Sequence, residues 1–143
     1  VLSVKWTDDS AENFRAIVQK IDWVRDHPAV AGLPVALFGA STGAAAALVA
    51  ASDPTRQFAA VVSRGGRPDL AGDRLRHVTA PTLLIVGGAD TVVIGLNEEA
   101  QRHLRCEHRL RIVPGATHLF EEPGTLESVA ELAAAWFVRK QWI

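Results

Sequence analysis

The stretch PVALFGASTGAAAALVAAS, residues 34–52, decides the fold of this chain. Its first residues are apolar and favour a strand, whereas its alanine-rich end favours a helix. Between them a serine, Ser41, lies between Gly39 and Gly43 at the point where the strand becomes a helix. Small residues on both sides let the backbone adopt a strained turn without a clash between strand and helix. The stretch therefore predicts a strand–turn–helix unit that places Ser41 at the carboxyl end of the strand.

The rest of the chain continues this alternation of strands and helices. An Asp9/Glu12 pair resembles a capping box, and the helix that it begins should run to about Asp26, with apolar residues at three- and four-residue spacing. The apolar run TLLIVG, residues 82–87, is typical of a parallel strand covered on both faces. The expected strands are residues 34–38, 59–63, 82–87 and 110–113, and the expected later helices are 43–51, 98–104 and 126–142.

This order predicts an α/β fold in which a parallel sheet of about four strands is flanked by helices and joined by right-handed crossovers. Residues 1–143 contain no internal repeat, low-complexity tract or linker, so we expect a single domain.

Amino-acid composition and net charge exclude several classes of protein. Apolar residues make up 48% of the chain and charged residues 22%, which is typical of a globular protein. A net charge of −1 gives no electrostatic reason to expect nucleic acid or an anionic membrane as partner. The sequence has no apolar run of spanning length and no signal-peptide pattern at its first residues, and its one cysteine excludes an intrachain disulfide. We therefore expect a cytoplasmic protein with a small-molecule partner.

A serine hydroxyl is a poor nucleophile unless a base and an orienting acid accompany it. Asp90 follows the third expected strand in LLIVGGADTVV, and His118 follows the fourth in LRIVPGATHLF. Loops after parallel strands converge at one edge of the sheet, so Ser41, Asp90 and His118 are predicted to meet there. The alternatives are an ordinary Gly-rich loop, a turn aspartate and a loop histidine packed on Phe120.

Other groups are predicted near the same edge. The backbone N–H of Thr42, at a helix N-terminus, is placed to bind a developing oxyanion. Arg64 and Arg67, in SRGGRPDLAG after the second strand, could contact a carboxylate or phosphate on a substrate. The alternative, which we favour, is that both arginines are solvated or pair with Asp69 and Asp73.

The remaining candidates are weaker. His27, His77, His103 and His108 lie at helix ends or in polar segments, and none has the spacing of metal ligands. Cys106 lies outside any strand–turn–helix unit, so a structural thiol is favoured over a nucleophile. We therefore expect neither a metal nor a cofactor.

The chain resembles the α/β-hydrolase superfamily, and within it the dienelactone hydrolase-related proteins. The resemblance is carried by GLPVALFGASTGAAAALVAA, VVSRGGRPDLAG, PTLLIVGGADTVV and VPGATHLFEEPGTL, and it covers nearly the whole chain. It implies that Ser41 is the nucleophile, Asp90 the triad acid, His118 the base and the Thr42 N–H an oxyanion donor. Dienelactone hydrolases carry cysteine at the nucleophile position, so the serine favours hydrolysis of simple esters over lactone opening.

Members of this superfamily usually have about eight strands and take a second oxyanion donor from a loop after an early strand. Nothing before Ser41 matches that loop, so we expect a truncated fold that resembles the carboxyl-terminal portion of the family's. Loss of neighbouring strands would expose an edge and apolar surface, which predicts a homo-oligomer.

The leading hypothesis is a serine hydrolase of carboxylic esters with short acyl chains, acting through an acyl-enzyme and without a cofactor. One alternative is a non-catalytic remnant that serves as a binding or assembly module. Another is a fragment that works only when its missing half is supplied in trans.

Overall fold

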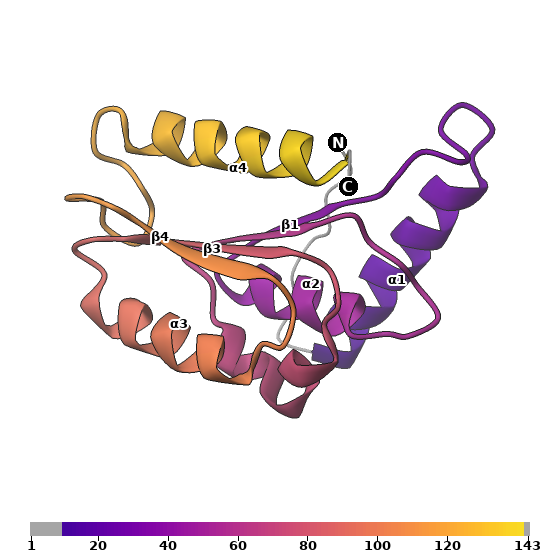
Figure 1. The fold of residues 1–143 in the computed structure, drawn as a ribbon, viewed down its shortest axis with the longest axis horizontal. Helices are drawn as coiled ribbons and strands as arrows, with labels where there is room; N and C mark the ends of the chain where they lie inside the picture. Colours follow the sequence, from indigo (N-terminus) through magenta and orange to yellow (C-terminus); the bar gives the residue numbers. More distant parts are fainter. Residues whose placement is uncertain (1–9, 142–143) are drawn as a thin grey trace.

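The computed structural model describes residues 10–141, which form one four-stranded parallel sheet in the order β1-β2-β3-β4 (Figure 1). This confirms the predicted α/β class and parallel sheet. The elements are α1 (Ser10–Asp26), β1 (Leu37–Ala40), α2 (Thr42–Ala51), β2 (Val61–Arg64), the 3-10 segment η1 (Pro68–His77), β3 (Thr82–Gly87), α3 (Thr91–His103), β4 (His108–Val113) and α4 (Thr125–Gln141).

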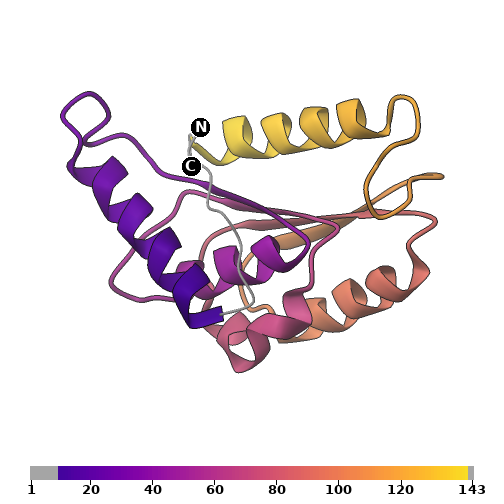
Figure 2. The same ribbon diagram turned by 180° about the vertical axis from the view of Figure 1, so that it is seen from behind.

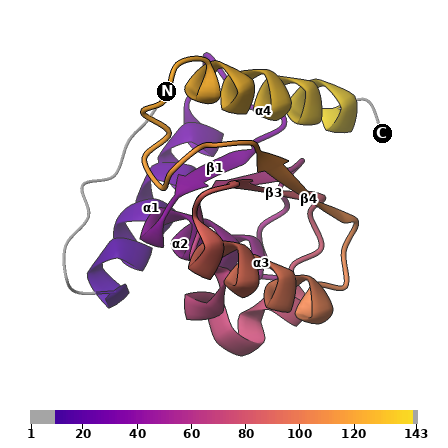
Figure 3. The same cartoon turned by 90° about the vertical axis from the view of Figure 1, so that its left-hand side faces the viewer.

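Two layers of helix cover the sheet. Helices α2 and α3 and segment η1 lie on one face, and α4 lies on the other (Figures 1 and 3). The view from behind shows the same separation, with α1 beside α2 (Figure 2). Alternate side chains of each central strand enter the two layers, so Val61 and Leu84 pack toward α2 and η1, whereas Val62 and Leu83 pack toward α4. Every residue of β3 is buried, as its continuous apolar run predicts.

Strand β3 has the predicted bounds, whereas the other strands differ by up to three residues at an end. β1 is Leu37–Ala40 and not 34–38, because its pairing with β2 begins at Leu37 and Val61. β4 begins at His108, two residues earlier than predicted, because the outer strand tolerates the exposed Arg109 and Arg111 in its register with β3.

The helices show larger differences. Helix α3 begins at Thr91 and not at residue 98, because burial of Val93 and Asn97 outweighs the weak helix propensity of a β-branched run that ends in glycine. Segment η1 lies where no helix or strand was predicted, and it buries Ala71 and Leu75. The Asp9 half of the predicted capping box and the expected helix end at residue 142 lie outside the described residues.

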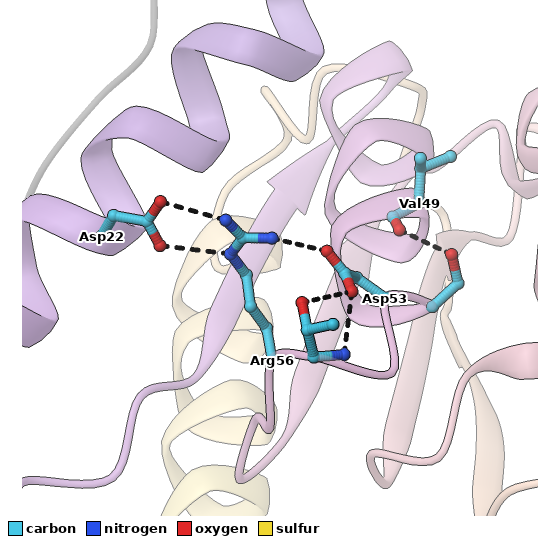
Figure 4. Close-up of polar contacts among 6 residues, drawn as sticks. Asp22, Val49, Asp53 and Arg56 are labelled. Carbon is cyan, nitrogen blue, oxygen red and sulfur yellow. Dashed lines mark hydrogen bonds and ion pairs between the residues drawn. The ribbon is translucent and has the colours of Figure 1, made fainter.

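An ion-pair cluster fixes α1 to the turn after α2 (Figure 4). The Arg56 guanidinium donates to both carboxylate oxygens of Asp22, over 3.1 and 3.0 Å, and to Asp53 over 2.5 Å. The hydrogen bond from Arg56 lowers the pKa of Asp22, and the bond from Thr55 does the same for Asp53. Bidentate geometry gives α1 a defined register against α2.

The outer strands β1 and β4 each have one neighbour in the described sheet, and the edge at β1 carries an exposed apolar residue. β1 pairs only with β2, and Phe38 on β1 is 50% exposed. Beside it a groove of about 940 Å³ runs between α1 and β1, with Trp23 and Phe137 among its apolar lining residues. Within residues 10–141 no helix is long and apolar enough to cross a membrane.

Candidate active site

The turn between β1 and α2 holds Ser41 in a strained backbone conformation. Its φ of 53° and ψ of −124° are rarely adopted by a residue with a side chain, at a cost of about 1–3 kcal/mol. Gly39 makes the turn possible, because a Cβ atom there would lie 2.5 Å from the Gly43 carbonyl oxygen. The predicted tight turn with small flanking residues is therefore present.

Neighbouring segments satisfy the Ser41 backbone and so hold this conformation. The Ser41 N–H donates to the Arg64 carbonyl of β2 over 3.1 Å. The Ser41 carbonyl accepts from the N–H groups of Ala44 and Arg67, each over 3.1 Å. Strain of this kind persists only where the surrounding structure over-determines it, as it does here.

The side chains of Ser41, His118 and Asp90 form one hydrogen-bonded line at the carboxyl ends of three strands. Ser41 Oγ lies 3.2 Å from His118 Nε2, and His118 Nδ1 lies 2.7 Å from Asp90 Oδ2. A carboxylate only accepts, so Nδ1 carries the proton and Nε2 is free to accept from the serine hydroxyl. The structure brings together all three residues predicted from the sequence.

Exposure differs along this line. The Asp90 side chain is 15% exposed and sits at the N-cap of α3, whereas the His118 side chain is 39% exposed. A partly solvated imidazole beside a sheltered carboxylate can exchange protons with a bound molecule while it keeps its orientation.

Helix α2 points its N-terminus at the same space. Thr42 is its first residue, and the first N–H groups of a helix have no intrahelical partner. The partial positive charge at this end favours an anion near Ser41. The N–H of Thr42 lies at this end of the helix, and its role as an oxyanion donor stays a prediction.

A second acid, Glu122, shapes the loop that carries His118. Its carboxylate accepts from the Thr117 N–H over 3.1 Å and from the Thr117 hydroxyl over 2.5 Å. The hydroxyl contact lowers the pKa of Glu122 below its usual range, with backbone hydrogen bonds adding to the effect. The sequence gives no signal for this contact, because a Thr–Glu pair five residues apart belongs to no standard turn pattern.

Replacing Glu122 with glutamine is expected to lower the Tm at pH 7, because an uncharged amide binds the two Thr117 donors more weakly. The wild-type carboxylate has a depressed pKa in the folded state, so its stabilising effect is present above pH ~4.5 and is lost as the pH falls. The Tm difference between the two proteins should therefore shrink on acidification. Thermal unfolding from pH 7 to pH 3 measures it, and a constant difference would contradict the assignment.

Arg64 and Arg67 have different surroundings, and Arg64 is the last residue of β2 and not part of the loop after it as predicted. Arg67 makes a bidentate ion pair with Asp69 over 2.9 and 2.7 Å, which the alternative interpretation anticipated. The Arg64 guanidinium lies over the Phe120 ring at 5.4 Å from its centroid, and among residues 10–141 its buried Nε has no hydrogen-bond partner. A substrate contact by Arg64 stays a prediction.

The side chains that were predicted to be non-catalytic make contacts away from the line of Ser41, His118 and Asp90. His27 packs on Trp23, with 4.7 Å between ring centroids, and His103 contacts Glu99 over 3.3 Å. Burial raises the pKa of the Cys106 thiol, which favours its protonated form.

Comparison with known proteins gives both fold and family relationships. A dienelactone hydrolase from Anabaena variabilis superposes with a TM-score of 0.88 at 53% identity, covering 92% of this chain and 61% of that one. Est1E from Butyrivibrio proteoclasticus has a TM-score of 0.77 at 15% identity, covering 91% of this chain and 70% of that one, and so shows the fold alone.

A Mycobacterium tuberculosis H37Rv protein is 62% identical over 122 residues, which are 85% of this chain and 28% of that protein. That protein is named provisionally as a phosphoribosyl transferase. The chain thus spans 61% of the Anabaena protein and little more than a quarter of the mycobacterial one. The sequence model of the dienelactone hydrolase family matches residues 1–143. The fold of this chain is that of the α/β-hydrolases. The chain belongs to the dienelactone hydrolase family.

Proposed function

We propose that this chain is a serine hydrolase of carboxylic esters with short acyl groups. The observation that carries the proposal is the line from Ser41 Oγ through His118 to Asp90, with contacts of 3.2 and 2.7 Å. Membership of a hydrolase family and the strained turn at Ser41 support it.

Each residue has a role in this proposal. Ser41 Oγ attacks the ester carbonyl carbon while His118 Nε2 takes the hydroxyl proton, and the Thr42 N–H binds the oxygen that becomes negative. Collapse of the tetrahedral intermediate breaks the ester bond, and His118 returns the proton to the departing alcohol. His118 then takes a proton from a water molecule that attacks the acyl carbon. The bond between Ser41 Oγ and the acyl group breaks, the carboxylic acid leaves, and His118 returns the proton to Oγ. Asp90 holds Nδ1 protonated and stabilises the imidazolium.

Thr42 is the one oxyanion donor that we assign among the described residues. A single donor of this kind is typically worth about 10²–10³ in rate, so an enzyme with one donor is expected to turn over slowly.

The proposal is tested with p-nitrophenyl acetate and butyrate as substrates and with a fluorophosphonate as a serine-directed label. We expect turnover of both esters and one phosphonyl group per chain, on the peptide that contains Ser41. His118→Ala should prevent both, because the serine hydroxyl loses its base. A folded wild-type protein that neither turns over ester nor takes the label would favour the alternative, a binding or assembly module.

The transferase name of the mycobacterial relative does not extend to this chain in our proposal. The 122 shared residues lie within the α/β-hydrolase fold described above, and most of that protein lies outside the match. We therefore place any phosphoribosyl transfer in the relative's other segments.

We propose a homo-oligomer in which a second copy covers the groove beside β1. Phe38 is 50% exposed and Trp23 57% exposed, and an unpaired edge with such neighbours is prone to association. The expected mass from light scattering at micromolar concentration is at least twice the chain mass of 15.4 kDa. Phe38→Asp should return it to the monomer value, because a charge at the interface is costly to desolvate. A monomeric wild-type chain would contradict the proposal.

A further inference from the structure

The turn formed by residues 64–67 contacts the backbone of Ser41 and lies beside the ring of His118. The backbone carbonyl of Arg64, at its start, accepts a hydrogen bond from the Ser41 N–H over 3.1 Å. The backbone N–H of Arg67, at its end, donates to the Ser41 carbonyl, also over 3.1 Å. Between them Gly65 has a φ of +52°, and a Cβ on it would lie 3.4 Å from the His118 ring atoms Nδ1 and Cε1. The turn therefore holds the Ser41 backbone at two points and borders the imidazole.

Helix α3 anchors this turn through a single buried side chain. Asn97 is fully buried and donates from Nδ2 to the Gly66 carbonyl over 3.0 Å. The same nitrogen donates to the Val93 carbonyl over 2.8 Å, one helical turn earlier, which fixes the direction of the amide. Because Asp90 is the N-cap residue of α3, one helix supports the acid directly and the Ser41–His118 contact indirectly.

Burial of the Asn97 amide at this position costs free energy of folding. Its Oδ1 is buried without a hydrogen-bond partner among the described residues, and such an atom loses its hydration without replacement. An apolar side chain of the same shape would avoid that cost. Buried polar atoms without a hydrogen-bond partner are expected mainly where a functional site needs a specific geometry.

We propose that Asn97 is a positioning residue, which holds the 64–67 turn through the Gly66 carbonyl and thereby sets the approach of Ser41 Oγ to His118 Nε2. The inference rests on the proposed hydrolase function. It gives a role to residues 64–67, whose backbone holds the turn at Ser41 through two hydrogen bonds. Asn97 was missed from the sequence because the predicted helix began one residue after it.

The first test is Asn97→Leu, which keeps the approximate volume and removes the donor. Small displacements of reacting groups are costly, so we expect kcat for p-nitrophenyl butyrate to fall about 10- to 100-fold with KM nearly unchanged. Amide hydrogen exchange should quicken at Ser41 and Arg67, whose N–H groups donate these two hydrogen bonds. The matched control is Leu104→Ala, which removes a buried side chain at the far end of α3 and should leave kcat unchanged.

The second test is Asn97→Asp, which also serves if the leucine variant does not fold. Burial favours the neutral carboxyl, which retains one O–H donor for the Gly66 carbonyl, whereas the ionised form has none. The kcat relative to wild type should rise as the pH falls. A ratio independent of pH would overturn the proposal.

The inference and the proposed function fail in different ways. If the wild type hydrolyses esters and Asn97→Leu has the kcat of the Leu104→Ala control, the positioning role is wrong. If the wild type shows no Ser41-dependent turnover, the hydrolase function is wrong. In that case the exchange rate of the Arg67 N–H decides the structural role alone: acceleration in Asn97→Leu supports it, and an unchanged rate rejects it.

Discussion

Replacing Ser41 with alanine is expected to lower kcat for p-nitrophenyl butyrate by about 10³-fold or more, with the fold retained. Without Oγ no acyl-enzyme can form, and His118 can act only on water. The residual rate would come from the Thr42 N–H and from substrate binding. Steady-state kinetics measures the loss, and circular dichroism with thermal unfolding measures the fold.

The backbone conformation makes alanine a suitable replacement here. Alanine and serine both carry a Cβ, so the strain of a φ of 53° remains in the variant and its stability should change little. Ser63→Ala is the matched control. Its Oγ is buried in the neighbouring strand β2 and has no hydrogen-bond partner in the part of the chain described, so activity should persist. Hydrolysis by Ser41→Ala at the wild-type rate would exclude Ser41 as the nucleophile.

The sequence was sufficient to predict which chemical groups meet, because parallel topology converts chain order into spatial order. Ser41, Asp90 and His118 lie one to five residues after three different strands, and parallel strands all end at one edge. The exact pairing registers were not needed for this inference. Errors of a few residues at the ends of β1 and β4 therefore left the predicted cluster intact.

What the sequence could not provide were supports that depend on tertiary contacts. The Asn97 amide reaches a carbonyl 31 residues away in the chain, and no local pattern encodes that pairing. The start of α3 was missed because its β-branched residues have low helix propensity, which burial of Val93 overrides. The role of Glu122 likewise depends on the path of the loop that carries His118, because this path places the Thr117 hydroxyl beside the Glu122 carboxylate.

Replacing Gly39 with alanine is expected to lower the free energy of unfolding by about 3 kcal/mol or more and to reduce hydrolysis with it. The added Cβ would lie 2.5 Å from the Gly43 carbonyl oxygen and 2.6 Å from the Ala44 Cα. Both atoms belong to the backbone of α2, which cannot rotate away as a side chain could. Either α2 moves off β1 or the turn opens, and in both cases Ser41 leaves its place beside His118. Urea unfolding gives the free energy.

Gly95→Ala separates this steric effect from the general effect of replacing glycine. Gly95 lies in the exposed part of α3, and an added Cβ there meets nothing within 4 Å. Alanine in a helix is favoured over glycine by roughly 0.5–1 kcal/mol, so this variant should be slightly more stable than wild type. The two substitutions add the same methyl group, and only the one at Gly39 meets backbone. Equal stability of both variants would mean that the turn has room for a side chain and that its serine is not held by close contact between β1 and α2.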